Sequence, residues 1–267
     1  MRPAWSDAFD PVPQVRSGGL PVTAEWAFDG ADGAGIDVAI VDSGVDHDHP
    51  DTAGEHLPGV AVTWDRDEQR VVEEEGPHGD LYGHGTACAA IIRRAAPACR
   101  ITSVRVLGSR LSGKGEVFAH GLRWAIGHGA RVLNLSLSTG KSEMFGLFHQ
   151  VADEAARAGV VLVCAMNNVP APTYPSEFSS VISVAASDGT DWNRLLASPE
   201  PPADFAAPGL DLELAWLDGG HIVATGNSFA APHVTGLAAR LLSKHPDLTP
   251  YQVKAVLRTI AVNAANS

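Results

Sequence analysis

Short apolar runs alternate along the chain with segments in which apolar residues recur every three or four positions. The first run, at residues 36–41, reads IDVAIV, and similar runs lie at residues 101–106, 132–137, 160–164 and 181–185. Strands that lack polar alternation are typically buried on both faces, as in parallel sheets covered by helices. We therefore expect five buried strands here, and a further strand at residues 221–225.

The segments between these runs have helical spacing. Residues 115–128, residues 144–158 and the segment after Ser228 each place apolar side chains on one stripe. A last helix has the clearest start, with Thr249 as N-cap, Pro250 in the first helical position and Gln252 completing a capping box. Alternating strands and helices predict an α/β fold, a three-layer sandwich with a mainly parallel central sheet and right-handed crossovers. Active sites of such sheets lie at the carboxyl ends of the strands.

Composition narrows the possible partners. Nineteen Lys and Arg against 31 Asp and Glu give a net charge of −12, which disfavours binding to nucleic acid or to an anionic membrane surface. No segment approaches the roughly 18 unbroken apolar residues of a membrane-spanning helix. The charge suggests basic substrates, although acidity also serves solubility. Residues 65–80 are strongly acidic and predict a solvated loop or hairpin.

Three cysteines, an odd number, are too few for a disulfide framework. We expect reduced, buried thiols at Cys88, Cys99 and Cys164, with a Cys88–Cys99 bridge as the alternative.

Two separate motifs place an acid and a base at the edges of predicted elements. Asp42 ends the first apolar run and is followed by Ser43-Gly44, while His84 lies between two glycines ahead of an apolar, helix-compatible run. A carboxylate at a strand end can orient a neighbouring base, and flanking glycines leave an imidazole accessible. Taken singly, each is equally consistent with a turn aspartate or a loop histidine.

Ser228 follows a predicted strand and a glycine turn, and begins a long amphipathic segment. Its hydroxyl would lie at the positive end of a helix dipole, among free backbone amides that can receive negative charge. We expect Pro232 to fall in the first turn of that helix, where its missing N–H costs little. The alternative for Ser228 is an ordinary N-cap.

The combination is more specific than its parts. Nucleophilic catalysis by serine needs a base to take the proton and a third group to fix the base. The chain presents Asp, His and Ser in the order that subtilisin has.

Three longer stretches carry a family resemblance. Residues 38–46 (VAIVDSGVD, followed by HPD at 49–51), 83–86 (GHGT) and 226–236 (GNSFAAPHVTG) are similar to the three signatures of subtilisin-like serine proteases, the subtilases. The resemblance extends from about residue 35 to about residue 260. It implies Ser228 as nucleophile, His84 as general base and acid, and Asp42 as the group that orients His84. Residues 164–168 (CAMNN) align Asn167 with the family's oxyanion asparagine.

The resemblance also implies a substrate edge at residues 134–137, which would pair with an extended peptide. The implied substrate-binding residues are Ser136, Leu137, Ser138, Cys164, Ala165 and Met166. Ser138 and Met166 replace family glycines, so we expect a narrowed pocket and a selective enzyme. Asn227 stands where the family has threonine; its amide either assists the oxyanion or points away.

The family's asparagine-rich calcium loop has no counterpart after His84, and we expect no metal and no cofactor. Cys88, four residues after His84, would pack behind the imidazole without acting as a nucleophile. We expect residues 1–34 to be a surface-wrapping segment of the same domain, residues 35–267 to be the peptidase domain, and the location to be cytoplasmic because no signal-peptide core is present.

The resulting hypothesis is a serine endopeptidase that forms an acyl-enzyme on Ser228, acting as a selective intracellular processing protease. Two alternatives stay open: a peptide ligase or macrocyclase with the same triad, and an inactive subtilase fold that binds peptides.

Overall fold

The computed structural model describes residues 22–263 except residues 77 and 190. Within this part, nine strands form one sheet in the order β3-β2-β4-β1-β5-β6-β7-β9-β8. β3 and β8 run antiparallel to their neighbours and the other pairings are parallel, so the predicted mainly parallel sheet is confirmed. The strands are β1 (Asp37–Asp42), β2 (His56–Asp65), β3 (Arg70–Glu75), β4 (Arg100–Arg105), β5 (Val132–Leu135), β6 (Val161–Ala165), β7 (Ile182–Ser187), β8 (Leu196–Ala197) and β9 (Phe205–Pro208).

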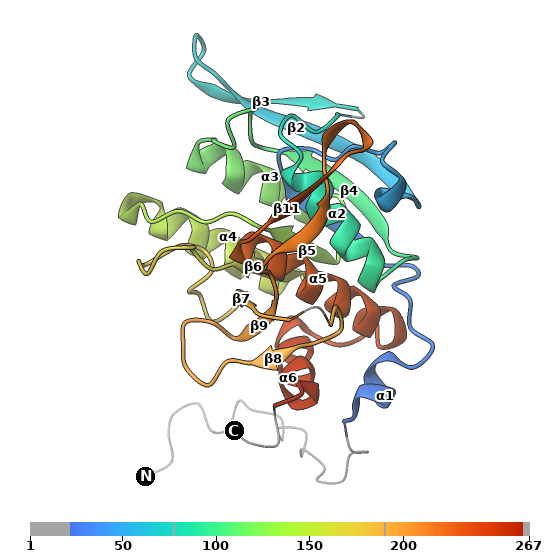
Figure 1. Cartoon of the computed structure of the whole chain (residues 1–267). Coiled ribbons are helices and arrows are strands. Elements are labelled where there is room, and N and C mark those ends of the chain that lie inside the picture. The colour runs from blue at the N-terminus through green and yellow to red at the C-terminus, as the bar shows by residue number, and fades with distance from the viewer. Residues whose placement is uncertain (1–21, 77, 190, 264–267) are drawn as a thin grey trace, which may run out of the picture.

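Helices cover both faces of this sheet (Figure 1). The helices are α1 (Ala24–Phe28), α2 (His84–Ala95), α3 (Gly115–Gly127), α4 (Phe145–Arg157), α5 (Asn227–Lys244) and α6 (Pro250–Ile260). In β1, Val38 and Ile40 pack into the core shared with α2, α5 and α6, whereas Ala39 and Val41 pack into the core shared with α3 and α4. This alternation explains why the strand carries apolar residues at each of positions 38–41. The three-layer sandwich is confirmed.

The predicted strands and helices match the observed ones to within two residues at each end. The difference reaches two residues at the ends of β5 and β7. β5 ends at Leu135 although the apolar run continues to residue 137. Beyond Leu135 the chain leaves the parallel ladder, and Thr139 forms an antiparallel bridge with Tyr174 instead. The capping box of α6 is present as predicted, with the side chains of Thr249 and Gln252 bonding each other's backbone N–H. A separate two-stranded ribbon joins β10 (Leu212–Ala215) to β11 (His221–Ala224).

The acidic stretch forms a hairpin, one of the two predicted outcomes. β3 pairs antiparallel with β2 and lies at the edge of the sheet, where its side chains are mostly exposed. Three glutamates there, at residues 73–75, therefore remain in water.

Pro232 lies in the interior of α5, and the expectation that it falls in the first turn is wrong. The helix begins at Asn227, which makes Pro232 its sixth residue. Because proline has no N–H, the carbonyl of Ser228 lacks the bond that a regular helix would give it. The thiol of Cys88 lies 3.9 Å from that carbonyl oxygen.

The predicted surface-wrapping segment lies in part outside the described residues, since residues 1–21 are not described. Residues 22–34 run against α5, where the Arg240 guanidinium donates to the carbonyls of Phe28 and Ala31. The division at residue 34 stays a prediction. None of the helices in the described part combines the length and apolar character that crossing a bilayer requires.

Candidate active site

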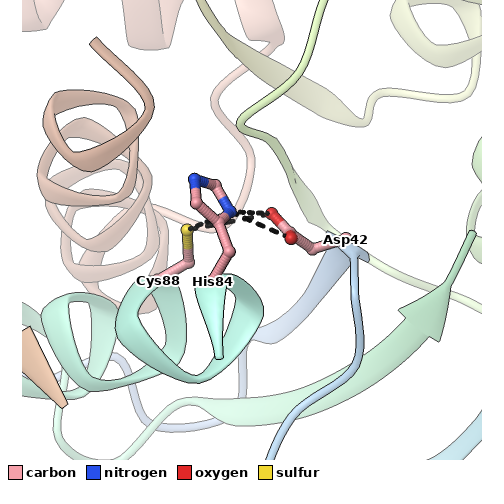
Figure 2. Close-up of side chains that lie close together, drawn as sticks. All are labelled: Asp42, His84 and Cys88. Carbon is pink, nitrogen blue, oxygen red and sulfur yellow. Dashed lines mark hydrogen bonds and ion pairs between the residues drawn. The ribbon is translucent and has the colours of Figure 1, made fainter. Parts of the chain in front are cut away.

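The carboxyl end of β1 and the start of α2 bring Asp42 and His84 together. Asp42 is the last residue of β1 and His84 the first of α2. The His84 Nδ1 lies 2.9 Å from each carboxylate oxygen of Asp42, as Figure 2 shows. The Ser43 backbone N–H donates to Asp42 Oδ1 at 2.7 Å, and both site residues are buried. Asp42 thus holds the proton of His84 on Nδ1, which leaves Nε2 as the acceptor.

Close backbone packing sets this pair in place. Gly83, directly before α2, has φ +106°, and Gly44, two residues after Asp42, has φ +117°, values that favour glycine. A Cβ on Gly85 would lie 1.9 Å from the carbonyl oxygen of Gly44. The two turns that carry Asp42 and His84 therefore touch through their main chains, which fixes the approach of β1 to α2.

Asp80 is a functional neighbour that sequence reasoning missed. Its carboxylate accepts from the backbone N–H groups of Gly83 and Thr86, each at 2.9 Å, and from the Thr86 hydroxyl at 2.7 Å. An acidic side chain at a helix N-terminus satisfies free N–H groups and stabilises the helix through its dipole. Asp80 thus holds the first turn of α2, on which His84 sits. Its position four residues before His84 was a sequence signal for such a cap.

The environment of His84 shifts its protonation. Burial alone would lower the pKa of His84, but the charge of the Asp42 carboxylate and its hydrogen bond outweigh burial and hold the pKa well above the ordinary value of 6.5. The raised pKa means that the protonated imidazolium form of His84 is more stable here than it would be in water. The Asp42 carboxylate supplies this stabilisation.

The raised pKa of His84 predicts that activity requires a higher pH than an ordinary histidine base would. A base must be neutral to accept a proton, so we expect kcat/KM for peptide hydrolysis to rise with pH through an inflection above 6.5. Steady-state kinetics between about pH 5 and pH 10 would measure it. An acid limb below 6.5 would contradict the raised pKa of His84.

The start of α5 lies against the imidazole. Ser228 is the second residue of α5, after Gly226 as N-cap, so the ordinary N-cap alternative for Ser228 is wrong. The ring of Phe229, the next residue, has its centroid 5.1 Å from that of His84. The Cys88 sulfur lies 4.0 Å from His84 Nδ1 and 3.9 Å from the Ser228 carbonyl oxygen. His84 and the main chain of Ser228 therefore contact the same sulfur atom. The first N–H groups of α5 have no partners within the helix.

Cys88 packs beside the imidazole, as its four-residue spacing predicts. Its sulfur is 3.3 Å from the Ser136 hydroxyl, and burial raises the pKa of the thiol. A buried neutral thiol is a poor nucleophile. All three cysteines are free and buried, so the alternative of a Cys88–Cys99 bridge is wrong.

A buried chain of polar side chains continues from Cys88 beneath the site. Asn134, in β5, donates to the Ser136 hydroxyl at 2.9 Å and accepts from the Thr235 hydroxyl of α5 at 2.9 Å. These bonds tie α2, β5 and α5 together under the imidazole, where an unpaired polar group would be costly. The sequence signal was an asparagine inside an otherwise apolar strand.

Asn167 and Asn227 connect the loop after β6 to the start of α5. The Asn227 amide nitrogen donates to the Asn167 carbonyl at 2.9 Å, and its Oδ1 accepts from the Ala186 N–H at 2.7 Å. The Asn227 N–H donates in turn to Asn168 Oδ1 at 2.9 Å. Of the two alternatives for Asn227, the structure favours the one in which its side chain points away from a substrate and holds the backbone. The Asn167 Oδ1 accepts a bond from Val169, and its Nδ2 donates to no group in the described part of the chain.

The six expected substrate-binding residues divide by exposure. Ser136, Cys164 and Ala165 are buried, and the last two pair with neighbouring strands of the sheet. Leu137 and Ser138, by contrast, line an apolar recess of about 20 Å³, too small for more than a water-sized group. Met166 is half-buried and its N–H donates to the Val184 carbonyl.

Away from this site, His49, Asp51 and His221 form a cluster of metal-ligand type. Both ring nitrogens of His49 already bond the backbone, one accepting from the Asp51 N–H and the other donating to the Gly220 carbonyl. His221 Nε2 lies 2.8 Å from Asp51 Oδ2. Hydrogen bonds account for this cluster, and the absence of a required metal stays a prediction.

Comparison with known proteins points to one family. The protein-family sequence model described as "Subtilase family" matches residues 33–267 of the chain. Thermitase from Thermoactinomyces vulgaris is 35% identical over 235 residues, covering 84% of this chain and 80% of its own length. Subtilisin E from Bacillus subtilis (strain 168) is 31% identical over 255 residues, and the match covers 89% of this chain but 63% of that relative. A solved structure titled as that of a cold adapted subtilisin-like serine proteinase superposes with a TM-score of 0.67 at 27% identity, over 84% of this chain and 81% of that chain.

Proposed function

Because this chain belongs to the subtilase family of serine peptidases, we propose that it is a selective endopeptidase with Ser228 as the nucleophile. The observation that carries the proposal is the bond from His84 Nδ1 to the buried Asp42 carboxylate, made beside the start of α5. An imidazole held in this way presents Nε2 as the only proton acceptor.

In the proposed reaction, the Ser228 hydroxyl attacks the carbonyl carbon of the peptide bond while its proton passes to His84 Nε2. The carbon–nitrogen bond then breaks, and His84 returns the proton to the leaving amine. A water molecule next attacks the acyl carbon, with His84 taking its proton. The bond from that carbon to Ser228 Oγ then breaks, His84 returns the proton to Ser228 Oγ, and the product leaves with a new carboxyl group. Asp42 stays ionised throughout and stabilises the imidazolium.

We propose that two donors stabilise the negative oxygen of each tetrahedral intermediate: the Ser228 N–H and the Asn167 amide. The Ser228 N–H belongs to the first turn of α5, whose donors lack intrahelical partners and lie at the positive end of the dipole. Asn227 supports the second donor, since it holds the loop that bears Asn167. Removing one such donor costs roughly 3–4 kcal/mol of transition-state stabilisation in comparable sites.

The proposed substrate is a peptide or protein segment bound in an extended form along residues 134–137, with no nucleic acid, membrane, metal or cofactor required. The cramped apolar recess lined by Ser138 supports selectivity over broad digestion. Three free thiols support a reducing, cytoplasmic location. In that setting the enzyme would process particular proteins.

The proposal is tested by labelling with a fluorophosphonate probe, which reacts with an activated serine. We expect one adduct, mapped to Ser228, and none on the Ser228→Ala variant of unchanged melting temperature. Absence of an adduct on the wild-type chain at alkaline pH would favour the inactive, peptide-binding alternative.

Product analysis then separates hydrolysis from transfer to an amine. With a peptide substrate and an added amine, mass spectrometry should find free carboxylates as the main product. Dominant amide products would favour the ligase alternative, and cleavage of most members of a peptide library would overturn selectivity.

A further inference from the structure

A cavity of about 390 Å³ lies between β2, the end of β4 and the start of α3, and it is lined by three cations. Arg66 comes from the β2–β3 turn, Arg105 from the end of β4, and Lys114 from the residue before α3. None of the lining residues is acidic. The cavity is therefore a positive recess in a chain of net charge −12.

The wall of this cavity is attached to the catalytic residues. The backbone N–H groups of Val106 and Leu107 both donate to the Asp42 carbonyl, at 2.8 and 3.2 Å. On the opposite wall, the Leu81 N–H donates to the Ser43 carbonyl at 3.0 Å, three residues before His84. The cavity wall is thus bonded through the main chain to the segment that carries Asp42.

The three cations of the cavity form no ion pair, a property that they share with eight other described Lys and Arg side chains, and Arg105 donates to the Gly79 carbonyl at 3.2 Å. Arg123 pairs with Glu154, and Lys254 pairs with Asp204. In the described part of the chain, no carboxylate lies within ion-pair distance of the cavity's three cations, although Asp and Glu outnumber Lys and Arg. Such a concentration of unpaired charge fits a carboxylate supplied from outside.

Trp64 lines the cavity, contacts one of its cations and has an indole nitrogen without a hydrogen-bond partner among the described residues. The Lys114 ammonium lies 3.6 Å from the centroid of its ring, which holds that charge at the cavity wall by a cation–π contact. The indole Nε1 of Trp64 is buried and has no hydrogen-bond partner among the described residues. Buried polar groups without partners are uncommon and mark places where a bound water or ligand belongs.

We propose that this cavity selects substrates by binding an acidic side chain, Asp or Glu, close to the bond that is cut. The inference rests on the proposed peptidase function and reverses the expectation of basic substrates drawn from net charge. Local charge decides recognition here, because contributions from distant carboxylates are screened beyond about 8 Å at physiological salt.

The test uses matched peptides that differ from a neutral cleaved peptide at one position. Each position on both sides of the cut is replaced in turn by Glu, Gln or Lys, and kcat/KM is measured. We expect Glu to exceed Gln by roughly fivefold at one or two positions, with Lys below both, and the preference to shrink as salt rises.

The variants Lys114→Gln and Arg105→Gln remove the charge and leave a shorter, polar, neutral side chain. We expect each to lower the Glu-to-Gln ratio and the double variant to bring it near one. Arg157→Gln removes an exposed charge on α4 and should leave the ratio as in the wild type. Lys114→Glu should reverse the preference toward Lys, which loss of folding alone cannot produce.

Equal cleavage of the Glu, Gln and Lys peptides at every position would overturn the inference while leaving the peptidase intact. If no peptide is cleaved and Ser228 takes no fluorophosphonate, the proposed function fails instead. In that case, fluorescence anisotropy of labelled Glu and Gln peptides on the wild-type chain still decides: tighter binding of the Glu peptide, lost in Lys114→Gln, supports the cavity, and equal binding overturns it.

Discussion

Replacing Asp42 with asparagine is expected to lower kcat for peptide hydrolysis by about 10⁴-fold while the fold persists. The substitution preserves the shape of the side chain and the bond from the Ser43 N–H to its oxygen. The substitution changes the partner of His84 Nδ1. In the wild type this nitrogen faces two carboxylate oxygens. An amide NH₂ directed at Nδ1 favours the tautomer that carries its proton on Nε2. That tautomer cannot accept the proton of Ser228.

The pH dependence of the residual activity distinguishes the loss of the carboxylate from a general loss of folded protein. With the carboxylate removed, burial remains as the main influence and lowers the pKa of His84. The acid limb of the residual activity should therefore move to lower pH than in the wild type. Asp51→Asn is a matched control, because Asp51 pairs with His221 on the surface and should change neither kcat nor the profile. A loss of less than about tenfold in Asp42→Asn would contradict the role given to Asp42.

Gly85→Ala is expected to destabilise the protein by about 3 kcal/mol or more and to remove activity. The added methyl carbon would lie 1.9 Å from the Gly44 carbonyl oxygen and 3.2 Å from the Asp42 Cβ. The obstacle is main chain, so no side-chain rotation relieves it. β1 and α2 must separate, which pulls His84 away from Asp42.

Denaturant unfolding would measure the loss of stability, and Gly146→Ala is its matched control. Gly146 is also the second residue of a helix, α4, and a Cβ there meets nothing within 4 Å. Alanine at that position should raise stability by about 0.5 kcal/mol through its helix propensity. Equal stability of the two variants would show that the contact between the two turns is not tight.

The fold was predictable because strands buried on both faces leave a clear sequence pattern. β1 alternates its side chains between two cores, so its composition alone identified it. β8, β9 and β10 were missed because they are short and carry little apolar periodicity. β2 was missed although it is ten residues long, because Pro58 and Gly59 interrupt its pattern. The position of Pro232 was misjudged, since the sequence does not reveal that α5 tolerates a lost bond at Ser228.

The pair Asp42 and His84 was predictable from motifs, whereas its surroundings were not. Asp80 makes local contacts and had a local signal, its position before His84. The roles of Asn134 and Asn227 depend on contacts between segments about 40 to 100 residues apart, which no local pattern encodes. The basic cavity was hidden for the same reason. Arg66, Arg105 and Lys114 are scattered through an acidic sequence, and only the β2–β3 hairpin and the end of β4 bring them together.

Asn227 links the start of α5 to the loop after β6 and to β7 through its side chain and its backbone N–H. The position of the start of α5 relative to the loop after β6 is set on the β6–β7 side of the sheet, whereas the cavity is built from β2 and β4 on the other. The hairpin tip that carries Arg66 forms no hydrogen bond with Asp42, His84 or Ser228 in the described part of the chain. Exchanging the hairpin tip at residues 66–69 should retune which sequences are cut without disturbing how they are cut.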